Sequence, residues 1–333
     1  MSTGPPDLVL TTAPFDRAAG TTPGIMREVL AVALLVLLAA CWHFGIGALL
    51  MVGAATLGAV GTEWFFTRTE APSPLRDWSA LTTGVLLGLT LPPTLPLWMA
   101  LLGGVVGIGL GKLIWGGLGQ NLFNPALVGR AFLQAAFPTA LTTWSAPVAR
   151  GDWLTLPDGL LAFPFTTDAV DAVSAATPLG LAKFEQQVTA VGLLFSGQTA
   201  GSLGETSAWL LLLCGVWLGA RRIFDWRLPV STLLCLAVLS QGLHWLLPES
   251  CPPASFMLLS GGLLFGAVFM VTDPVTTPTT PRGAWLFGAG VAALVVLIRL
   301  FGGLPEGVMY AILLMNALTP HINRHTQPRP FGG

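Results

Sequence analysis

Apolar stretches separated by short polar segments recur along almost the whole chain. A bilayer core about 30 Å thick needs about 20 apolar residues per helix, and about ten runs approach that length. They cover approximately residues 28–43, 46–66, 79–91, 97–115, 126–144, 207–223, 228–247, 256–271, 283–301 and 307–318. Several runs are short. Because backbone that leaves helical geometry at membrane depth must be buried in protein or line a cavity, we expect internal sites where a run breaks.

The composition indicates an all-α integral membrane protein. Hydrophobic residues make up 53% of the 333 residues and charged residues only 9%, well below the charge of a typical soluble domain. The net charge of −1 offers no polyanion-binding surface, so we expect no nucleic-acid partner. The four cysteines show no CxxC or Cys/His spacing, and we therefore expect neither a metal site nor a disulfide. The N-terminus lacks a cleavable signal pattern, and we expect the first span to be retained.

The distribution of basic residues predicts the orientation. Most of the 15 Lys and Arg residues fall in segments that are cytoplasmic if both termini are cytoplasmic. The predicted organisation is a cytoplasmic tail (1–26), a first membrane half with five spans (27–144), an extracytoplasmic loop (145–206), a second membrane half with five spans (207–320) and a cytoplasmic tail (321–333). Carboxylates outnumber basic residues in the long loop. We therefore expect this loop to be extracytoplasmic.

An internal repeat relates the two membrane halves. The segment 83–88 (TGVLLG) is similar to 261–266 (GGLLFG), and 122–126 (LFNPA) is similar to 314–317 (LMNA). The first pair opens the third and the eighth span, and this odd offset gives the two copies opposite topology. We expect two inverted repeats of about five helices each, which in membrane proteins often meet at a central site. Chance similarity between Gly- and Leu-rich segments is the alternative.

The glycine-rich segment 116–130 (GGLGQNLFNPALVGR) predicts a helix that begins at the membrane edge. Asn124 is a good N-cap and Pro125 suits the first helical position. The free N–H groups of such a helix start can bind an anion, a carbonyl or the edge of a flavin ring. Arg130 lies about one turn inside the span, where a cation is costly, and we expect either a site role or a pairing with a buried carbonyl.

A second interruption lies at 272–281 (TDPVTTPTTP). Asp273 followed by Pro274 repeats the pattern of a cap followed by proline, and the alternating Thr and Pro residues predict a rigid extended segment rather than a helix. We interpret it as a cytoplasmic re-entrant segment that lines a cavity. An ordinary proline-rich loop is the alternative.

Four other ionisable residues lie near the predicted span ends: His43, Glu63, Lys112 and His244. Interfacial anchoring or snorkelling is the usual role of such side chains. An ion-binding or proton-relay role is the alternative for each.

The segment Asp171–Thr177 (DAVSAAT) is a compact polar motif inside the long extracytoplasmic loop. Small residues such as Ala176 leave the Thr177 hydroxyl accessible to a modifying enzyme. Pro178 disfavours helical geometry at Thr177, so we expect an exposed, extended acceptor. Asp171 and Ser174 either position the segment during modification or form a local turn.

This motif resembles the acceptor site of flavin transferases, which attach FMN through its phosphate to a threonine. The usual motif has Gly where this chain has Ala175, and the substitution keeps a small side chain. Together with the segments 119–132 and 272–278 and the ten spans, it makes the chain resemble the D subunits of Rnf electron-transport complexes. The B subunits of sodium-pumping NADH:quinone oxidoreductases are related to these.

The resemblance implies ten helices in two inverted halves and covalent FMN on Thr177, with the heptad as its binding segment. It also allows a second, non-covalent riboflavin, for which Asn124, Arg130 and Asp273 are the candidate residues. The implied partners are a flavin transferase, a periplasm-facing subunit with its own covalent FMN, further membrane subunits, and cytoplasmic iron–sulfur and NADH-oxidising subunits. The complex would couple electron transfer between NADH and ferredoxin to Na⁺ or H⁺ movement, and this subunit alone would not be catalytic.

The competing hypothesis is a channel or transporter built on inverted repeats, without a redox role. In that hypothesis the chain breaks at Asn124 and at Asp273 form the permeation path. Neither the transported ion nor any catalytic residue follows from the sequence.

Overall fold

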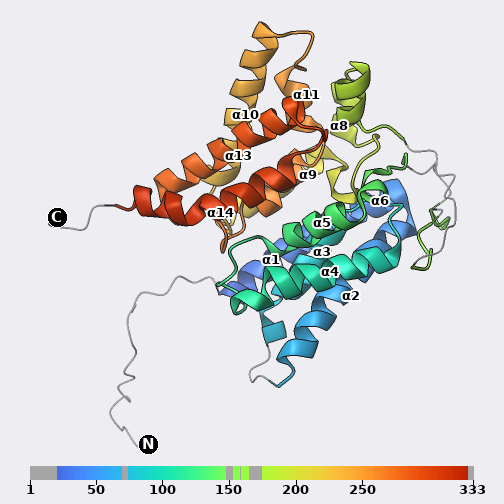
Figure 1. Ribbon diagram of the computed structural model, residues 1–333, viewed down its shortest axis with the longest axis vertical. Helices are drawn as coiled ribbons and strands as arrows, with labels where there is room; N and C mark the ends of the chain where they lie inside the picture. The colour runs from blue at the N-terminus through green and yellow to red at the C-terminus, as the bar shows by residue number, and fades with distance from the viewer. Residues whose placement is uncertain (1–20, 70–73, 148–152, 158, 165–174, 329–333) are drawn as a thin grey trace, which may run out of the picture.

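The computed structural model describes residues 21–69, 74–147, 153–157, 159–164 and 175–328, and within these ranges the chain is helical and contains no strand (Figure 1). Five helical segments are long and apolar enough to cross a membrane. They are Thr22–Phe44, Ile46–Thr67, Leu97–Trp115, Arg227–Leu246 and Pro281–Phe301. Two shorter apolar helices, Ser79–Leu89 and Ala208–Ala220, accompany them.

All ten apolar runs contain helix, as the hydropathy pattern predicts. The first half holds α1 (Thr22–Phe44), α2 (Ile46–Thr67), η1 (Pro74–Asp77), α3 (Ser79–Leu89), α4 (Leu97–Gly111), η2 (Leu113–Trp115), α5 (Pro125–Ala136) and α6 (Pro138–Thr142). The connection holds α7 (Pro178–Gly180), η3 (Leu181–Glu185), α8 (Val191–Ser196) and η4 (Leu203–Glu205). The second half holds α9 (Ala208–Ala220), α10 (Arg227–Leu246), α11 (Ala254–Leu259), α12 (Leu263–Phe265), η5 (Gly266–Met270), α13 (Pro281–Phe301) and α14 (Val308–Thr326).

Two of the predicted runs are broken helices. The run 126–144 divides into α5 and α6 at Pro138, because proline has no N–H to continue the hydrogen-bond ladder. The run 256–271 divides at Ser260–Gly262, and its second part is the short helix α12 followed by the π-helix η5. Gly261 has a φ of 64°, and a Cβ there would lie 2.5 Å from Leu179 Cδ1. Only glycine suits this break.

The two halves pack internally in the same pattern. In the first half α2 packs on α3 and α4, and α4 packs on α5; in the second, α10 packs on α11 and α13, and α13 packs on α14. Figure 1 shows α1–α5 gathered as one bundle and α10, α11, α13 and α14 as another. The helices α5 and α14 meet between the bundles.

The outer helix faces expose large apolar side chains. Leu57 and Phe66 on α2 are 70% and 65% exposed, and Val238 and Trp245 on α10 are 65% and 77% exposed. Such side chains are costly to expose to water over extended faces. Their exposure agrees with the membrane environment that the composition predicts.

Candidate functional site

Thr177 lies in the wall of a cavity of about 380 Å³. The cavity lies between α5, the π-helix η5, the N-terminal end of α14 and the segment that carries Thr177. Its lining is mostly apolar and includes Leu127, Trp144, Phe184, Phe265, Met270, Met309 and Tyr310. We call it the Thr177 cavity. Its volume and apolar lining are those of a small-molecule site.

The backbone at Thr177 is extended, with φ −71° and ψ 154°, as Pro178 predicts. The Thr177 hydroxyl accepts a hydrogen bond from the Gly180 N–H at 3.1 Å and caps the short helix α7. The expectation of an exposed acceptor is wrong, because Thr177 is only 5% exposed. The cap draws its side chain against α7, while the neighbouring Pro178 and Leu179 are also buried. In the described structure Thr177 therefore lies at the wall of a cavity and not on an exposed loop.

The rest of the acceptor segment is divided between described and undescribed residues. Ala175 and Ala176 line the Thr177 cavity, and the Ala175 N–H donates to the Trp144 carbonyl at 2.8 Å. Asp171 and Ser174 lie outside the described residues. The backbone bond to Trp144 holds the segment against the chain that follows α6.

Arg130 lines the same cavity, so the fold brings together Arg130 and Thr177. Its guanidinium forms an ion pair with Glu306 at 3.0 Å, and the two side chains are 12% and 19% exposed. The pairing with a buried carbonyl that the sequence left open is therefore wrong: the partner is a carboxylate. An ion pair this buried holds both side chains in place.

Sequence reasoning singled out none of the three carboxylates of this cavity, Glu185, Glu205 and Glu306. Burial and the charge of Glu306 raise the pKa of Glu205 to about 7, while Arg130 and hydrogen bonds from Ser202 act in the opposite direction. Glu205 forms a capping box with Ser202. The Ser-x-x-Glu spacing of residues 202–205 is the sequence signal that identifies this turn.

Arg299 is a further buried cation close to these carboxylates. It lies at the end of α13, is 4% exposed, and donates to the carbonyls of Met257 and Ser260. Those carbonyls lie at the break between α11 and α12, where they lack helical partners. Arg299 therefore stabilises the break, and its charge also acts on Glu205 and Glu306.

Asn124 and Asp273 lie at a second cavity of about 70 Å³ and not in the lining of the Thr177 cavity. Asn124 Oδ1 accepts the N–H groups of Ala126 and Leu127 at 3.0 and 3.3 Å, which confirms the predicted cap of α5. Its Nδ2 donates to Asp273 Oδ2 at 3.2 Å. The two chain breaks singled out in the sequence thus meet each other.

The segment after η5 is non-helical until α13 begins at Pro281, and part of it lines the second cavity, as predicted. Asp273 Oδ1 accepts the Val275 N–H at 3.1 Å, which forms a turn. No helix begins at Pro274, as expected, but the segment forms turns and bends rather than the predicted rigid extended structure. The reason is local, because the next residues bond back to Asp273: the Thr277 hydroxyl donates to its carbonyl at 2.7 Å.

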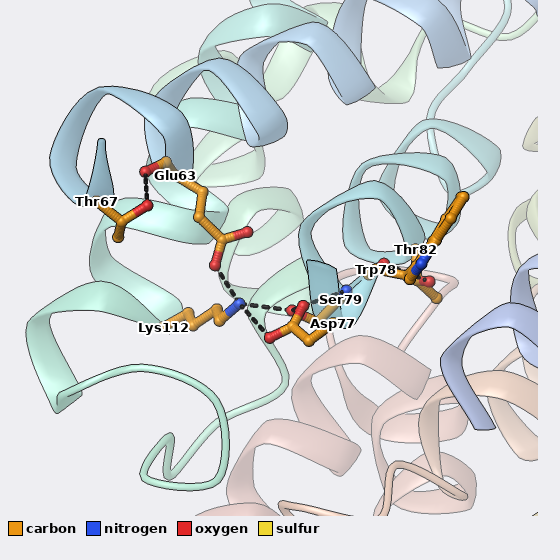
Figure 2. A network of polar contacts seen from close by, with 7 residues as sticks. All are labelled: Glu63, Thr67, Asp77, Trp78, Ser79, Thr82 and Lys112. Carbon is orange, nitrogen blue, oxygen red and sulfur yellow. Dashed lines mark hydrogen bonds and ion pairs between the residues drawn. The ribbon is translucent and has the colours of Figure 1, made fainter. Parts of the chain in front are cut away.

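Figure 2 shows a buried charge network that contradicts the snorkelling expected for Glu63 and Lys112. The Lys112 ammonium forms an ion pair with Glu63, donates to Ser79 Oγ at 2.5 Å and lies 3.6 Å from Asp77 Oδ2. Lys112 and Glu63 are 2% and 0% exposed. These side chains point into the space between α2, α3 and the end of α4 rather than toward the membrane interface. Each can be buried because the opposite charge of the other compensates its own.

The two histidines near span ends form hydrogen bonds. His43 Nε2 lies 3.3 Å from Ser207 Oγ, and His244 Nδ1 lies 2.7 Å from the Cys251 carbonyl. Each bond connects a helix end to a neighbouring segment, which is compatible with the anchoring expected of them.

Comparison with known proteins identifies relatives over nearly the whole chain. The sequence model of the NQR2, RnfD, RnfE family matches residues 9–332. The D subunit of the proton-translocating ferredoxin:NAD(+) oxidoreductase complex of Clostridium ljungdahlii is 40% identical over 302 residues, which cover 87% of this chain and 86% of the relative. The D subunits of the ion-translocating oxidoreductase complexes of Stutzerimonas stutzeri and Pseudomonas aeruginosa are 43% and 40% identical, over 78% and 96% of this chain and 78% and 95% of the relatives.

Proposed function

The chain belongs to the NQR2, RnfD, RnfE family, and from that premise we propose that it is the D subunit of an ion-translocating ferredoxin:NAD oxidoreductase complex that carries FMN esterified to Thr177. Its relatives are named as subunits of such a complex. It takes part in electron transfer coupled to Na⁺ or H⁺ movement across the bacterial inner membrane, and it completes no turnover alone. Its partners are the remaining subunits and the flavin transferase that modifies Thr177.

The position of Thr177 in the wall of a 380 Å³ apolar cavity carries this proposal. Ligand pockets commonly have volumes of about 300–1,000 Å³ with apolar and aromatic walls and a few polar groups. Phe265, Met270 and Tyr310 provide the apolar surface that suits a flat aromatic ring, and Arg130 provides a cation. The residues present therefore fit a flavin whose phosphate is attached at Thr177.

Different residues of the cavity would hold different parts of the FMN. Thr177 supplies the hydroxyl oxygen of the ester, and the Gly180 N–H fixes the direction of that oxygen. Arg130, held by Glu306, places a fixed positive charge in the same cavity. Apolar walls exclude water and strengthen the effect of that charge. When bound, FMN supplies the one-electron chemistry that none of these side chains can perform.

The membrane topology belongs to the same proposal. Ten spans in two inverted halves are supported by the matching pattern of helix packing in the two halves. Cytoplasmic termini and a periplasmic segment 145–206 are supported by the distribution of Lys and Arg along the chain. The contact between α5 and α14 supports a pseudo-symmetry axis between them. The short helices α3 and α9 and the two broken runs require protein or cavity around them at membrane depth.

The second cavity does not fit the riboflavin for which Asn124 and Asp273 were candidates. It contains both residues, and its volume of about 70 Å³ lies well below the range of flavin-sized sites. The proposed function therefore includes one flavin, the FMN on Thr177.

In-gel fluorescence tests the covalent flavin. The full-length chain is co-expressed with a flavin transferase, denatured and run on a gel, together with Thr177→Ala and Thr177→Ser. We expect a fluorescent band for the wild type, none for Thr177→Ala, and retained fluorescence for Thr177→Ser if the transferase accepts serine. Mass spectrometry of the peptide that spans residues 165–183 locates the modification. A dark wild-type band with solute flux in vesicles would instead support the channel or transporter.

A further inference from the structure

Four charged side chains form a cluster at the Thr177 cavity: Arg130, Glu205 and Glu306 line it, and Arg299 lies outside the lining and acts on both carboxylates through its charge. Arg130 comes from α5, Glu205 from η4, Arg299 from the end of α13, and Glu306 from the segment before α14. We call them the charge cluster. Their formal charges cancel, so the addition of a single proton or electron to this region leaves an uncompensated charge.

Within the cluster the two carboxylates are held differently. Glu306 forms an ion pair with Arg130 at 3.0 Å. Glu205 forms no ion pair within 4 Å among the described residues, and its hydrogen bonds come from Ser202, whose N–H donates to Oε2 over a long 3.4 Å. Glu205 Oε1 is buried and accepts no hydrogen bond from the described part of the chain. An ionised oxygen in that state is costly, and protonation of the carboxyl removes the cost.

Two glycines make the room in which the Glu205 carboxylate lies. A Cβ on Gly262 would lie 3.1 Å from Glu205 Oε1, and a Cβ on Gly201 would lie 2.8 Å from Oε2. The carboxylate is therefore enclosed by backbone on both sides, while Glu205 also lines the Thr177 cavity. The Glu205 carboxyl therefore borders the cavity, and its Oε1 has no hydrogen-bond donor among the described residues.

We propose that Glu205 is the proton-holding residue of the Thr177 cavity: it takes up one proton when one negative charge arrives there and releases it when that charge leaves. The inference rests on the proposed flavin site. The electron comes from an electron-transfer partner of the complex, or from an electrode in the laboratory. The proton comes from water, an O–H bond forms on the Glu205 carboxylate, and the same bond breaks when the electron is removed.

The neighbouring groups favour Glu205 over other titratable residues for this role. The charged groups that face it are Glu306, Arg130 and Arg299, and the first two are bound to each other. Glu185 lines the same cavity but is exposed, and Tyr310 on α14 is 37% exposed. Because the pKa of Glu205 already lies at about 7, a modest change in nearby charge is enough to switch its protonation.

The proton site is tested first without flavin. The full-length Thr177→Ala chain is titrated between acidic and alkaline pH, and infrared difference spectra follow the C=O stretch of protonated carboxyl groups. We expect one carboxyl that titrates near neutral pH, whose band is absent when Glu205→Gln is added and retained when Glu185→Gln is added. Adding Glu306→Gln instead lowers the pH of this titration by about one unit or more, because a like charge is removed. This variant keeps the test valid where Glu205→Gln does not fold.

The link to electron transfer is tested on the flavin-loaded wild type, reduced at an electrode. We expect reduction to produce the protonated carboxyl band, and Glu205→Gln to abolish it while flavin fluorescence on the gel remains. A band that persists in Glu205→Gln, or no carboxyl that titrates near neutral pH, would overturn the inference. A wild-type chain without covalent flavin would instead refute the proposed function together with the electron-linked proton uptake. In that case the titration of the Thr177→Ala chain would still decide whether Glu205 is a proton site.

Discussion

The backbone N–H of Asn124 donates a hydrogen bond to Asn316 Oδ1 at 3.4 Å, across 192 positions of the chain. These are the two asparagines that the internal repeat placed at corresponding positions near the end of each half. Asn124 also donates to Asp273, and Asn316 Nδ2 donates to the Thr276 carbonyl at 3.2 Å. The same segment between η5 and α13 therefore binds both asparagines, and the two halves meet where helix α5 begins.

Replacing Asn316 with alanine is expected to lower stability by about 1–3 kcal/mol, because the buried Asn124 N–H loses its partner, while the Thr276 carbonyl keeps the hydrogen bond from Thr319. Asn316 is fully buried. The measurement is the thermal midpoint of the full chain in detergent. Asn323→Ala is the matched control, since that side chain accepts one bond from the Thr279 N–H at the surface. Equal losses for the two variants would contradict the role of Asn316 between the halves.

Replacing Lys112 with methionine is expected to cost about 3–5 kcal/mol, because the buried Glu63 carboxylate loses its cation. Adding Glu63→Gln removes the uncompensated charge and should recover much of this loss. The control is Arg221→Met, which breaks the ion pair with Glu28 on a side chain that is 56% exposed. That change should cost far less than Lys112→Met, because exposed ion pairs contribute little to stability. Chemical unfolding of the four proteins would disprove the network's importance if Lys112→Met and Arg221→Met behaved alike.

The sequence predicted the positions of the helices well but not their breaks. Each of the ten predicted runs contains helix, and five helical segments are long and apolar enough to cross a membrane. The cap and proline at Asn124 and Pro125 predicted the start of α5 to the residue. The break at Ser260–Gly262 depends on a left-handed glycine, Gly261, and on Arg299, which binds the freed carbonyls from a distant helix. A hydropathy pattern describes only neighbouring residues, so it cannot predict a break that depends on a side chain from a distant helix.

The candidate site was predictable only in part for a related reason. Thr177 and Arg130 were singled out by motif and by charge at membrane depth, and they do line one cavity. Glu205 and Glu306 are far from Arg130 in the sequence. Glu205 belongs to a capping box and Glu306 to no motif, so the sequence does not indicate that the fold brings them to the cavity that Arg130 lines. Lys112 and Glu63 were misjudged because their distance from a span end does not tell which way a helix is rotated. Glu63 is one of the buried residues of α2, and Lys112, which follows α4 with the non-helical angles φ −126° and ψ −58°, is buried as well.

Replacing Gly104 with alanine should destabilise the first half. Its added Cβ would lie 2.2 Å from the Ala55 carbonyl oxygen of α2, so α4 must move away from α2. We expect a loss of about 1–3 kcal/mol or more from overpacking. Gly109 lies on the same helix with nothing within 4 Å of its added Cβ. Gly109→Ala should leave stability unchanged or raise it by up to about 1 kcal/mol through helix propensity. A higher thermal midpoint for Gly104→Ala than for Gly109→Ala would refute the close approach of α2 and α4.

Glu205 should make the stability of the folded chain depend on pH in a defined direction. Its pKa rises from an ordinary value of 4.5 to about 7 on folding, so between these values the folded chain holds a proton that the unfolded chain has lost. Its contribution to the free energy of unfolding is therefore fully present below about pH 4.5, decreases as the pH rises through this window, and is absent above about pH 7. The difference is on the order of a few kcal/mol. The free energy of unfolding, measured against pH, should show this decline in the wild type and a flatter profile in Glu205→Gln. Glu249→Gln, a change in an exposed loop, is the control and should decline like the wild type. If Glu205 instead made the free energy of unfolding rise with pH in this window, burial would not dominate its ionisation.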